Sequence, residues 1–443
     1  MFRSCTALSF VVAVASACGA SDGDGTGGGP DAGVSGDVTY YQDIKPIVDA
    51  KCVRCHVDGG VAPFGLEGYE AVRDRAGVSL LEIEADRMPP WKANHDCNDY
   101  VGDFSLTDHE KALFATWVDQ GTPEGDPSKP GDPIPVEDTR LSRVDLTLSM
   151  PEAYTARTAR DYTDDYRCFV IEWPAEFTTT KYVAGFKAVP GHLGTVHHVI
   201  AYYATPEQAQ AYYDLDAEDP QPGYQCFGGP GGPAQTWIGG WAPGGQGFDM
   251  PPGTGMPIEP GSLIVLQVHY NTLYEAPQPD ITSVQFKLED AVDREVWTQP
   301  WANPQWLSGT SMHIPAGEKD VVHSWQFDLT WLTNGDPLLI YSAGLHMHNL
   351  GTRGISTIRR ADGGEDCLIQ IDDWDFDWQD GYGLRTPARF NPGDQLYLEC
   401  HWDNSPENQV VVDGQPRPPQ DVYWGDGSTD EMCLGVFLVS RAD

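Results

Sequence analysis

The stretch GLHMHNLG, residues 344–351, places two histidines, His346 and His348, one residue apart. Side chains at positions i and i+2 of a β-strand point to the same face, so the two imidazoles would project together and Met347 would point the other way. The apolar and small residues of LLIYSAG, which lead into this stretch, favour a buried strand. Two co-facing imidazoles are a candidate half of a metal site. The alternative is a pair of ordinary hydrogen-bonded core histidines.

Two further stretches with strand character carry histidines. TVHHVIAYY contains His197 and His198, and SLIVLQVHYN contains Gln267 and His269. Adjacent residues on a regular strand face opposite sides, so His197 and His198 would bind one ion only if the backbone bulges there or if they use different ring nitrogens. Gln267 and His269 share one face of a strand that is otherwise apolar on both faces, so both need polar partners. Gln267 is therefore a candidate polar residue lining a site.

A fourth stretch near the C-terminus, TDEMCLGVFLV, also reads as a strand. Met432 and Cys433 are adjacent in it, so their side chains would face opposite sides. Met432 would then face a site while Cys433 faces the interior of its domain.

A different chemistry is indicated by the motif KCVRCH, which has the spacing C-x-x-C-H. This spacing would allow Cys52 and Cys55 to bind the haem vinyl groups as thioethers while the adjacent His56 reaches the iron. The alternatives are a redox cysteine pair or a zinc site, which would need two further ligands. The segment resembles small c-type cytochrome modules that carry M-P-P-W after their haem motif. That resemblance implies His56 as the proximal ligand and Met88, in DRMPPW, as the distal one, with His95 as the alternative.

Secondary structure near these motifs follows from spacing. YYQDIKPIVDAKC places its apolar residues at helical intervals, and TDHEKALFATWVDQG begins with a capping box formed by Thr107 and Glu110. IDDWDFDW, residues 371–378, alternates acidic with aromatic residues, which predicts a strand with its aromatic rings packed inward. A calcium site or a sugar-binding platform is the alternative for this segment.

The first residues predict export. MFRSCTALSFVVAVASACGA has one arginine, an apolar stretch too short to span a bilayer, and small residues up to Cys18. We expect a signal peptide at 1–18 with lipidation of Cys18, and an outer-membrane or cell-surface lipoprotein facing the periplasm or the exterior of a Gram-negative bacterium. The alternative is simple secretion, in which Cys18 is lost with the signal.

Composition limits the partners and the fold. Among 443 residues, 27 Lys and Arg against 66 Asp and Glu give a net charge of −39, which argues against nucleic acid as a partner and against membrane binding other than through a lipid anchor. The chain has 35 Pro, 48 Gly and many aromatic residues, which fits a loop-rich, mostly β protein. Flexible, Gly- or Pro-rich segments at 19–36 and 123–140 are expected linkers on either side of a small haem domain at 37–122.

Taken together and in this order, VHHVIAYY, LQVHYN, GLHMHNLG and DEMC resemble the copper type II ascorbate-dependent monooxygenases. The resemblance covers roughly residues 150 to 443. It implies two tandem jelly-roll-like β-sandwich domains, at 141–293 and 294–443. The predicted fold class is thus mostly β, with a small all-α cytochrome c-like domain in front.

The same resemblance implies two copper ions. The electron-transfer copper would be bound by His197, His198 and His269. The oxygen-activating copper would be bound by His346, His348 and Met432. The ligand types fit, because imidazoles suit both oxidation states of copper and a thioether favours Cu(I). Zinc sites seldom include methionine.

Disulfide pairing is also implied by the resemblance. Family-like contexts surround Cys168 with Cys226 and Cys400 with Cys433. If these pairs form, Cys97 and Cys367 remain. A bond between those two would tie the haem domain to the second sandwich.

The sequence departs from the peptide-processing member of the family at the residues expected to hold a substrate carboxylate. An arginine two residues before the first His of the H-x-H pair is replaced by Gly344, and an asparagine and a tyrosine after the methionine ligand are replaced by Leu434 and Val436. A buried carboxylate without such partners is unfavourable. We therefore expect an uncharged substrate.

The sequence thus predicts an exported copper-dependent monooxygenase that hydroxylates a C–H bond of a small molecule with O₂. Ascorbate or another one-electron donor, including a periplasmic one, would supply electrons, and the covalent haem c would relay them. The alternative is a haem and copper electron-transfer or copper-handling lipoprotein without hydroxylase activity.

Overall fold

The computed structural model describes residues 36–58, 62–158, 163–233, 236–242, 245–272, 275–412 and 415–442. The expected signal peptide, with Cys18, and nearly all of the first linker lie outside the described residues. From Asp37 onward, the described chain forms one compact unit. No helix in these ranges is both long and apolar enough to cross a membrane.

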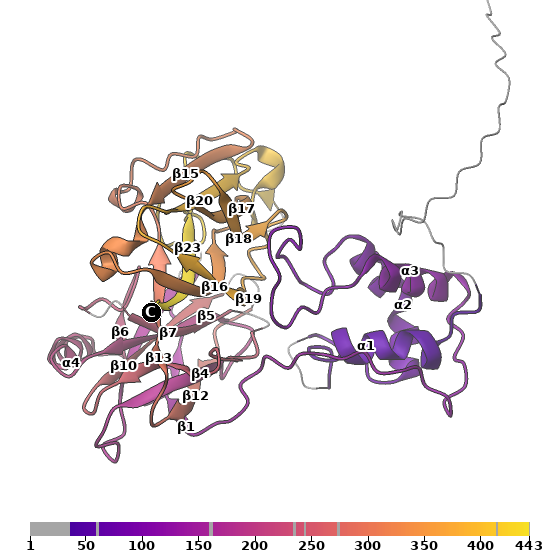
Figure 1. Ribbon diagram of the computed structural model, residues 1–443, viewed down its shortest axis with the longest axis horizontal. Coiled ribbons are helices and arrows are strands. Elements are labelled where there is room, and N and C mark those ends of the chain that lie inside the picture. Colours follow the sequence, from indigo (N-terminus) through magenta and orange to yellow (C-terminus); the bar gives the residue numbers. More distant parts are fainter. Residues whose placement is uncertain are drawn as a thin grey trace, which may run out of the picture. The chain divides into compact units, whose positions relative to one another are not determined.

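The N-terminal part is helical, as the sequence predicts (Figure 1). Its elements are the π-helical turn η1 (Tyr40–Ile44), α1 (Lys45–Lys51), α2 (Tyr69–Glu84) and α3 (Asp108–Asp119). Thr107 and Glu110 form the expected capping box at the start of α3. α2 is a helix that the sequence analysis missed. Its apolar residues do not form a clear stripe, and Gly77 and Ser79 in its second half weaken the helical signal.

Two sheets, antiparallel except for one pair of strands, follow and pack face to face. The six-stranded sheet has the order β1-β12-β4-β9-β13, with β8 also paired to β4. Its strands are β1 (Leu146–Ser149), β4 (Lys181–Val189), β8 (Phe248–Asp249), β9 (Thr254–Ile258), β12 (Ser283–Glu289) and β13 (Arg294–Glu295), of which β13 pairs in parallel with β9. Both sheets contribute to one core, with Phe186 and Phe286 from this sheet and Phe169 and Leu266 from the other.

The partner sheet carries three of the predicted site histidines. Its order is β6-β3-β10-β5-β7. Its strands are β3 (Asp164–Glu172), β5 (Val196–Ala204), β6 (Tyr224–Gln225), β7 (Thr236–Trp241) and β10 (Leu263–Asn271). β10 lies in the middle of the sheet and is buried from Leu263 to Tyr270, as its two apolar faces predict.

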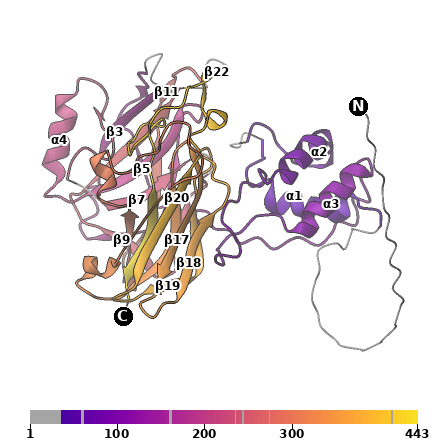
Figure 2. The same ribbon diagram turned by 90° about the horizontal axis from the view of Figure 1, so that it is seen from above.

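A second pair of antiparallel sheets forms from the rest of the chain (Figure 2). One has the order β14-β23-β16-β19, with β14 (Trp297–Trp301), β16 (Leu338–His346), β19 (Gly381–Phe390) and β23 (Leu434–Arg441). The other has the order β15-β20-β17-β18, with β15 (Val321–Phe327), β17 (Gly351–Arg359), β18 (Glu365–Ile371) and β20 (Gln395–Trp402). Ile340 and Phe437 of the first share a core with Ile358 and Leu398 of the second.

Short elements complete the described chain. β2 (Tyr154–Thr155) pairs with β11 (Pro279–Asp280), and β21 (Val411–Val412) pairs with β22 (Gln415–Pro416). One more α-helix, α4 (Ala209–Glu218), and the 3-10 turns η2 (Trp306–Ser308), η3 (Leu329–Thr333) and η4 (Pro406–Asn408) lie in connections. A mostly β protein with a few N-terminal helices is therefore confirmed.

One predicted strand is wrong. β18 ends at Ile371, and residues 372–380 form turns and irregular chain that lead to β19. We name residues 372–380 the aromatic loop. Trp374 is buried in it, but Phe376 and Trp378 are only partly buried. The alternation of acidic and aromatic residues predicted a strand because period-2 patterns in a short segment do not distinguish a strand from a loop with alternating contacts.

The described residues form three disulfides, which are the pairs expected from the sequence: Cys97–Cys367, Cys168–Cys226 and Cys400–Cys433. The first joins the segment before α3 to β18. Isolated β-bridges from Ala93 to Ile371 and from Tyr100 to Leu384 extend this contact. The N-terminal helical segment is thus fixed to the second pair of sheets by covalent and hydrogen-bonded links.

Candidate metal centres

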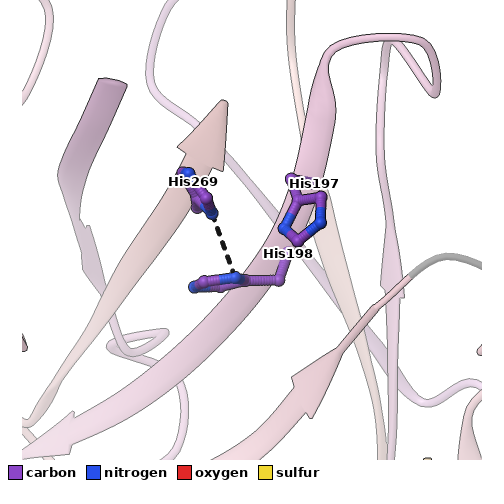
Figure 3. Close-up of side chains that lie close together, drawn as sticks. All are labelled: His197, His198 and His269. Carbon is purple, nitrogen blue, oxygen red and sulfur yellow. Dashed lines mark hydrogen bonds between the residues drawn. The ribbon is translucent and has the colours of Figure 1, made fainter. Parts of the chain in front are cut away.

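His197 and His198 on β5 and His269 on β10 come together on neighbouring strands (Figure 3). One nitrogen from each ring lies within 4.8 Å of the others. Among the described residues, this is a cluster of three ligand side chains with the donor type that copper prefers. We name it the three-histidine set.

A β-bulge allows adjacent residues to contribute to this set. His269 pairs with His198, whereas the next residue, Tyr270, pairs with Val196. His197 is therefore the extra residue of the bulge. The bulge removes the strict alternation of faces, which is one of the two conditions that the sequence set for His197 and His198 to share an ion.

The proton on His269 is placed by Asp164. Nε2 of His269 donates to Asp164 Oδ1 at 2.9 Å, which leaves Nδ1 of His269 as the nitrogen that faces the set. That Nδ1 lies 3.2 Å from Nδ1 of His198. Imidazole nitrogens bind ions of this size at about 2.0–2.1 Å, so nitrogens at this separation fit a shared ion. Tyr166 stacks on the His269 ring, with centroids 4.0 Å apart, and fixes its plane.

Asp164 is held ionised. Burial alone would raise the pKa of its carboxyl, but hydrogen bonds from His269, Ser428 and Asn271 lower that pKa to about 2. Ser428 Oγ donates to Asp164 Oδ2 at 2.8 Å. Because Ser428 precedes β23, this bond connects the three-histidine set to the second pair of sheets.

Both ring nitrogens of His197 are buried, and neither has a hydrogen-bond partner among the described residues. A buried nitrogen without a partner is unfavourable, and an ion would satisfy it. Burial, with the neighbouring His269, lowers the pKa of His197 to about 3, and burial lowers the pKa of His198 well below its usual value. Neutral imidazoles are the form that binds metal, so the donors fit copper.

His346 and His348 form a second centre. Their Nε2 atoms lie 3.2 Å apart. Each Nδ1 has another partner, which is the side-chain oxygen of Gln379 for His346 and the carbonyl of Asp430, at 3.1 Å, for His348. Both rings therefore present Nε2 to the same point. Burial lowers the pKa of His346 to about 4 and that of His348 well below its usual value, so both are neutral at pH 7.

Met347 takes no part in this centre. It is fully buried in the core of the second pair of sheets, as strand alternation predicts. Gly354 on β17 packs against it, and a Cβ at that position would come within 3.3 Å of the Met347 methyl group.

The pairing of β16 with β23 bears on the expected ligand Met432. The last paired residues are His346 and Leu434. Beyond them, the backbone N–H of His348 donates to Glu431 at 2.8 Å, so the two chain segments stay close. If the antiparallel register continued beyond the strand ends, Met432 would be opposite His348. Met432 as a copper ligand remains a prediction, which this register supports.

Glu431 is a buried carboxyl group next to the second centre. Its two oxygens accept from the backbone of His348 and Leu350 and from Trp402 Nε1 at 2.8 Å. Burial raises the pKa of Glu431 to about 7, although these bonds oppose the rise. The carboxyl group therefore ties together the two chain segments that supply His348 and Met432.

Gln267 is placed away from the ligand atoms. Its amide donates to the Gly229 carbonyl at 2.8 Å and lies 3.7 Å from Cys226 Sγ, beside the Cys168–Cys226 disulfide. These contacts give Gln267 a structural role, and its lining of a substrate site stays a prediction. His192, His313, His323 and His401 have polar partners elsewhere in the sandwiches, as expected for ordinary histidines.

The residues expected to hold haem lie in the N-terminal segment. Cys52, Cys55 and His56 follow α1 in a turn in which the His56 N–H donates to the Cys52 carbonyl at 3.0 Å. His56 Nδ1 donates to the Phe64 carbonyl at 3.0 Å, which leaves Nε2 for a ligand. Met88 is 41% exposed in its proline-rich loop.

The alternative distal ligand, His95, has both ring nitrogens engaged. Nδ1 pairs with Asp103 at 3.3 Å, and Nε2 faces Ser105 Oγ at 3.1 Å. The choice between Met88 and His95 as the distal ligand stays a prediction.

The residues that orient the ligands were not recognised as such from the sequence. Asp164, Gln379, Phe376 and Glu431 all contact a site histidine. Glu431 precedes Met432 in the DEMC motif, and Phe376 belongs to the segment 371–378, which was expected to be a strand. The others lie far from their histidines along the chain, so no spacing rule links them.

The fold and these centres define a mostly β, disulfide-bonded protein with two groups of histidines that could bind metal. Residues 153–276 match the N-terminal domain of the copper type II ascorbate-dependent monooxygenases, and residues 309–439 match the C-terminal domain. Together the two matches cover more than half of the chain. The chain belongs to this family of enzymes.

Curated relatives agree with the assignment. The chain is 26% identical over 386 residues to human DBH-like monooxygenase protein 1, covering 78% of this chain and 56% of that protein. The mouse protein of the same name is 26% identical over 275 residues, covering 56% and 40%. The chain thus spans about half the length of these relatives. Among solved structures, the major capsid protein P2 of bacteriophage PM2 covers 67% of this chain and 97% of its own, at 8% identity and a TM-score of 0.26, which carries no conclusion.

Proposed function

We propose that this protein hydroxylates a C–H bond of a small, uncharged molecule, using one copper ion at the three-histidine set and one at His346, His348 and Met432. The observation that carries the proposal is the geometry of the donors. In each centre two imidazole nitrogens lie 3.2 Å apart. The other ring nitrogen is oriented by Asp164 for His269, by Gln379 for His346 and by the Asp430 carbonyl for His348. That the metal is copper is inferred from membership of the family.

The stoichiometry of hydroxylation determines which co-substrates the reaction needs. One atom of O₂ enters the C–H bond, the other leaves as water, and two electrons and two protons are consumed. An ascorbate-type donor supplies the electrons one at a time. Copper, when bound, supplies the one-electron chemistry and the interaction with O₂ that no side chain offers.

The residues of the chain keep the centres ready for this chemistry. Asp164 holds the proton of His269 on Nε2, and Gln379 and the Asp430 carbonyl orient His346 and His348. The low pKa values of His197 and His346, about 3 and about 4, keep the lone pairs available at neutral pH. Metal binding therefore needs little release of protons.

The surroundings of His346 favour an uncharged substrate. Gly344, Leu434 and Val436 share the strand faces next to His346 on β16 and β23. A Cβ at Gly344 would lie 3.3 Å from the Asp380 carbonyl, so the neighbouring chain closes over the position where the peptide-processing relatives are expected to carry arginine. Leu434 and Val436 are partly exposed and apolar. Such a surface gives no partner to a carboxylate.

The proposal includes a covalent haem at Cys52 and Cys55, with His56 and Met88 as axial ligands. The family matches begin at residue 153, so the support comes from the C-x-x-C-H spacing and from the orientation of His56. The hydrogen bond from His56 Nδ1 to Phe64 leaves Nε2 available, which fits an axial ligand. Bound haem supplies one-electron transfer next to the sandwiches.

The C-x-x-C-H turn contacts the first sandwich directly. Gln246 Nε2 donates to the Arg54 carbonyl at 2.6 Å and lies 3.4 Å from Cys55 Sγ. Gln246 follows β7, which pairs with β5, the strand of His197 and His198. This contact supports electron supply from the N-terminal segment to the three-histidine set.

The haem proposal is tested by expression in a host that matures c-type cytochromes. We expect haem that stays attached under denaturing conditions, and its loss in the Cys52→Ser/Cys55→Ser variant. Non-covalent or absent haem in the unmodified protein would contradict it. If Met88→Ala and His56→Ala variants kept full turnover with a physiological one-electron donor, the supply of electrons through this segment would be refuted.

The hydroxylase proposal is tested with copper-loaded protein, reductant and ¹⁸O₂. We expect one labelled oxygen atom in a product from a panel of uncharged aromatic and aliphatic compounds, and no product from glycine-extended peptides. Two bound coppers without any product across the panel would instead indicate an electron-transfer or copper-handling protein.

Export and lipidation of Cys18 complete the proposal. The disulfides fit an oxidising compartment outside the cytoplasm. Radiolabelled palmitate should be incorporated into the unmodified protein and not into Cys18→Ser.

A further inference from the structure

The aromatic loop, residues 372–380, contacts histidines of both centres. Trp374 Nε1 donates to the His348 carbonyl at 3.1 Å, and Gln379 Oε1 accepts from Nδ1 of His346. Between them in the loop, Phe376 reaches His197. The loop belongs to the second pair of sheets, whereas His197 belongs to the first.

The Phe376 ring lies between one histidine of each centre. It stacks on His197 with centroids 4.8 Å apart and an interplanar angle of 22°. It meets His348 edge-on, with centroids 6.0 Å apart and an angle of 84°. Both arrangements are preferred geometries for aromatic rings. A single side chain thus contacts both centres.

The orientation of the His197 ring depends on such contacts more than those of His269 and His346 do. Asp164 orients His269, and Gln379 orients His346, but neither ring nitrogen of His197 has a polar partner among the described residues. Its other ring neighbours are His198 and His269, at 5.8 and 5.0 Å. Among the described residues, Phe376 is therefore the one aromatic side chain outside the expected ligands that stacks on His197.

The loop that carries Phe376 is itself anchored. Lys92 pairs with Asp373 at 2.9 Å, and Asn94 donates to Asp372 at 2.5 Å. Trp374 packs against Gly351, where a Cβ would come within 2.8 Å of the indole. A ring on a loop held at several points has a defined position from which to orient its neighbour.

We propose that Phe376 is a positioning residue that fixes the plane of the His197 imidazole and holds the three-histidine set in a defined arrangement relative to His348. The inference rests on the proposed function for its catalytic meaning. The ring contact itself does not depend on that function.

The test compares Phe376→Leu, which removes the ring, with Phe376→Tyr, which retains it. The matched control is Phe327→Leu on β15, whose ring contacts Trp301 and Trp325. In metal-free protein, NMR of ¹³C-labelled histidine rings should show a ring-current-shifted His197 signal in the unmodified chain. The shift should disappear in Phe376→Leu and persist in Phe376→Tyr and Phe327→Leu.

With copper bound, His269→Ala identifies the Cu(II) EPR signal of the three-histidine set, because that variant should lose it. The same signal should change in Phe376→Leu. Turnover should fall in kcat by roughly tenfold to a hundredfold with little change in KM, because a misplaced ligand affects the reaction more than substrate binding. Phe376→Tyr should restore both, and thermal unfolding midpoints should confirm that each variant is folded.

The outcomes separate this inference from the hydroxylase proposal. An unchanged His197 signal and EPR spectrum in folded Phe376→Leu would overturn the positioning role, even if the protein hydroxylates. Failure of tyrosine to rescue, or an equal change in Phe327→Leu, would also overturn it. A shifted His197 signal in a protein that makes no product would support the positioning role while refuting the hydroxylase proposal.

Discussion

Asp164 lies 2.9 Å from Nε2 of His269 and fixes which nitrogen of that ring faces the three-histidine set. The same carboxylate accepts a hydrogen bond from Ser428, 264 residues further along the chain. A single ionised side chain therefore sets a ligand tautomer in the first sandwich and connects it to the segment that leads to Met432. This relationship explains why ligands from distant parts of the sequence keep a defined arrangement.

Removal of the Asp164 charge should weaken copper binding. In Asp164→Asn, the proton on His269 Nε2 loses a charged acceptor, and we expect the copper affinity of the three-histidine set to fall by about 10- to 100-fold. Competition with a chelator of known affinity measures the change. Asp214→Asn, at an exposed position of α4, is the control and should bind as the unmodified protein does. Equal affinities in both variants would refute the role of Asp164.

Met432 and Met347 should behave oppositely. Met432→Ala should abolish hydroxylation and leave the copper of the three-histidine set bound. Met347→Leu exchanges one buried apolar side chain for another of similar volume, so we expect a loss of stability below about 1.5 kcal/mol and retained activity. Copper content and product formation distinguish the two variants. A hydroxylating Met432→Ala protein would show that Met432 is no ligand.

Copper occupancy should depend little on pH between 7 and 5. A proton competes for an imidazole lone pair only as the pH approaches its pKa, which burial lowers to about 3 for His197 and about 4 for His346. An exposed histidine, with a pKa near about 6.5, would already be losing copper at pH 6. Equilibrium dialysis at pH 7, 6 and 5, with circular dichroism to confirm folding, measures this. A steep loss between pH 7 and 6 would contradict the buried, neutral state of these rings.

The Cys97–Cys367 bond should stabilise the chain by constraining its unfolded state. Replacing both cysteines by serine should lower the free energy of unfolding by about 2–5 kcal/mol. The double replacement should also raise the protease sensitivity of the segment around Tyr100. In the structure, Tyr100 packs against Tyr382 with ring centroids 5.6 Å apart. Denaturant titration and limited proteolysis measure both effects. Unchanged values in the double variant would show that the bond is dispensable.

Local patterns in the sequence predicted which histidines come together. The i, i+2 spacing of His346 and His348 and the buried character of β10 follow from periodicity, which strands obey. A bulge at His197 was one of the two conditions deduced from periodicity, and the register shift beside His269 is that bulge. These features depend on neighbours along the chain, so spacing is enough to find them.

Contacts between distant residues could not be predicted in this way. Asp164 and Gln379 orient histidines that lie 105 and 33 residues away, and only the paired sheets bring them together. The segment 371–378 was expected to be a strand, because its alternation resembles one. Its aromatic residues instead lie in a loop between β18 and β19, where Phe376 contacts both centres. α2 was missed because it lacks a clear apolar stripe.

The most direct test of the two-copper account is a copper titration of metal-free protein followed by EPR and metal quantitation. We predict two equivalents in the unmodified protein, one equivalent in His269→Ala, and a different single equivalent, with altered EPR parameters, in the His346→Ala/His348→Ala variant. One equivalent in the unmodified protein, or a content unaffected by either set of substitutions in folded protein, would contradict the account.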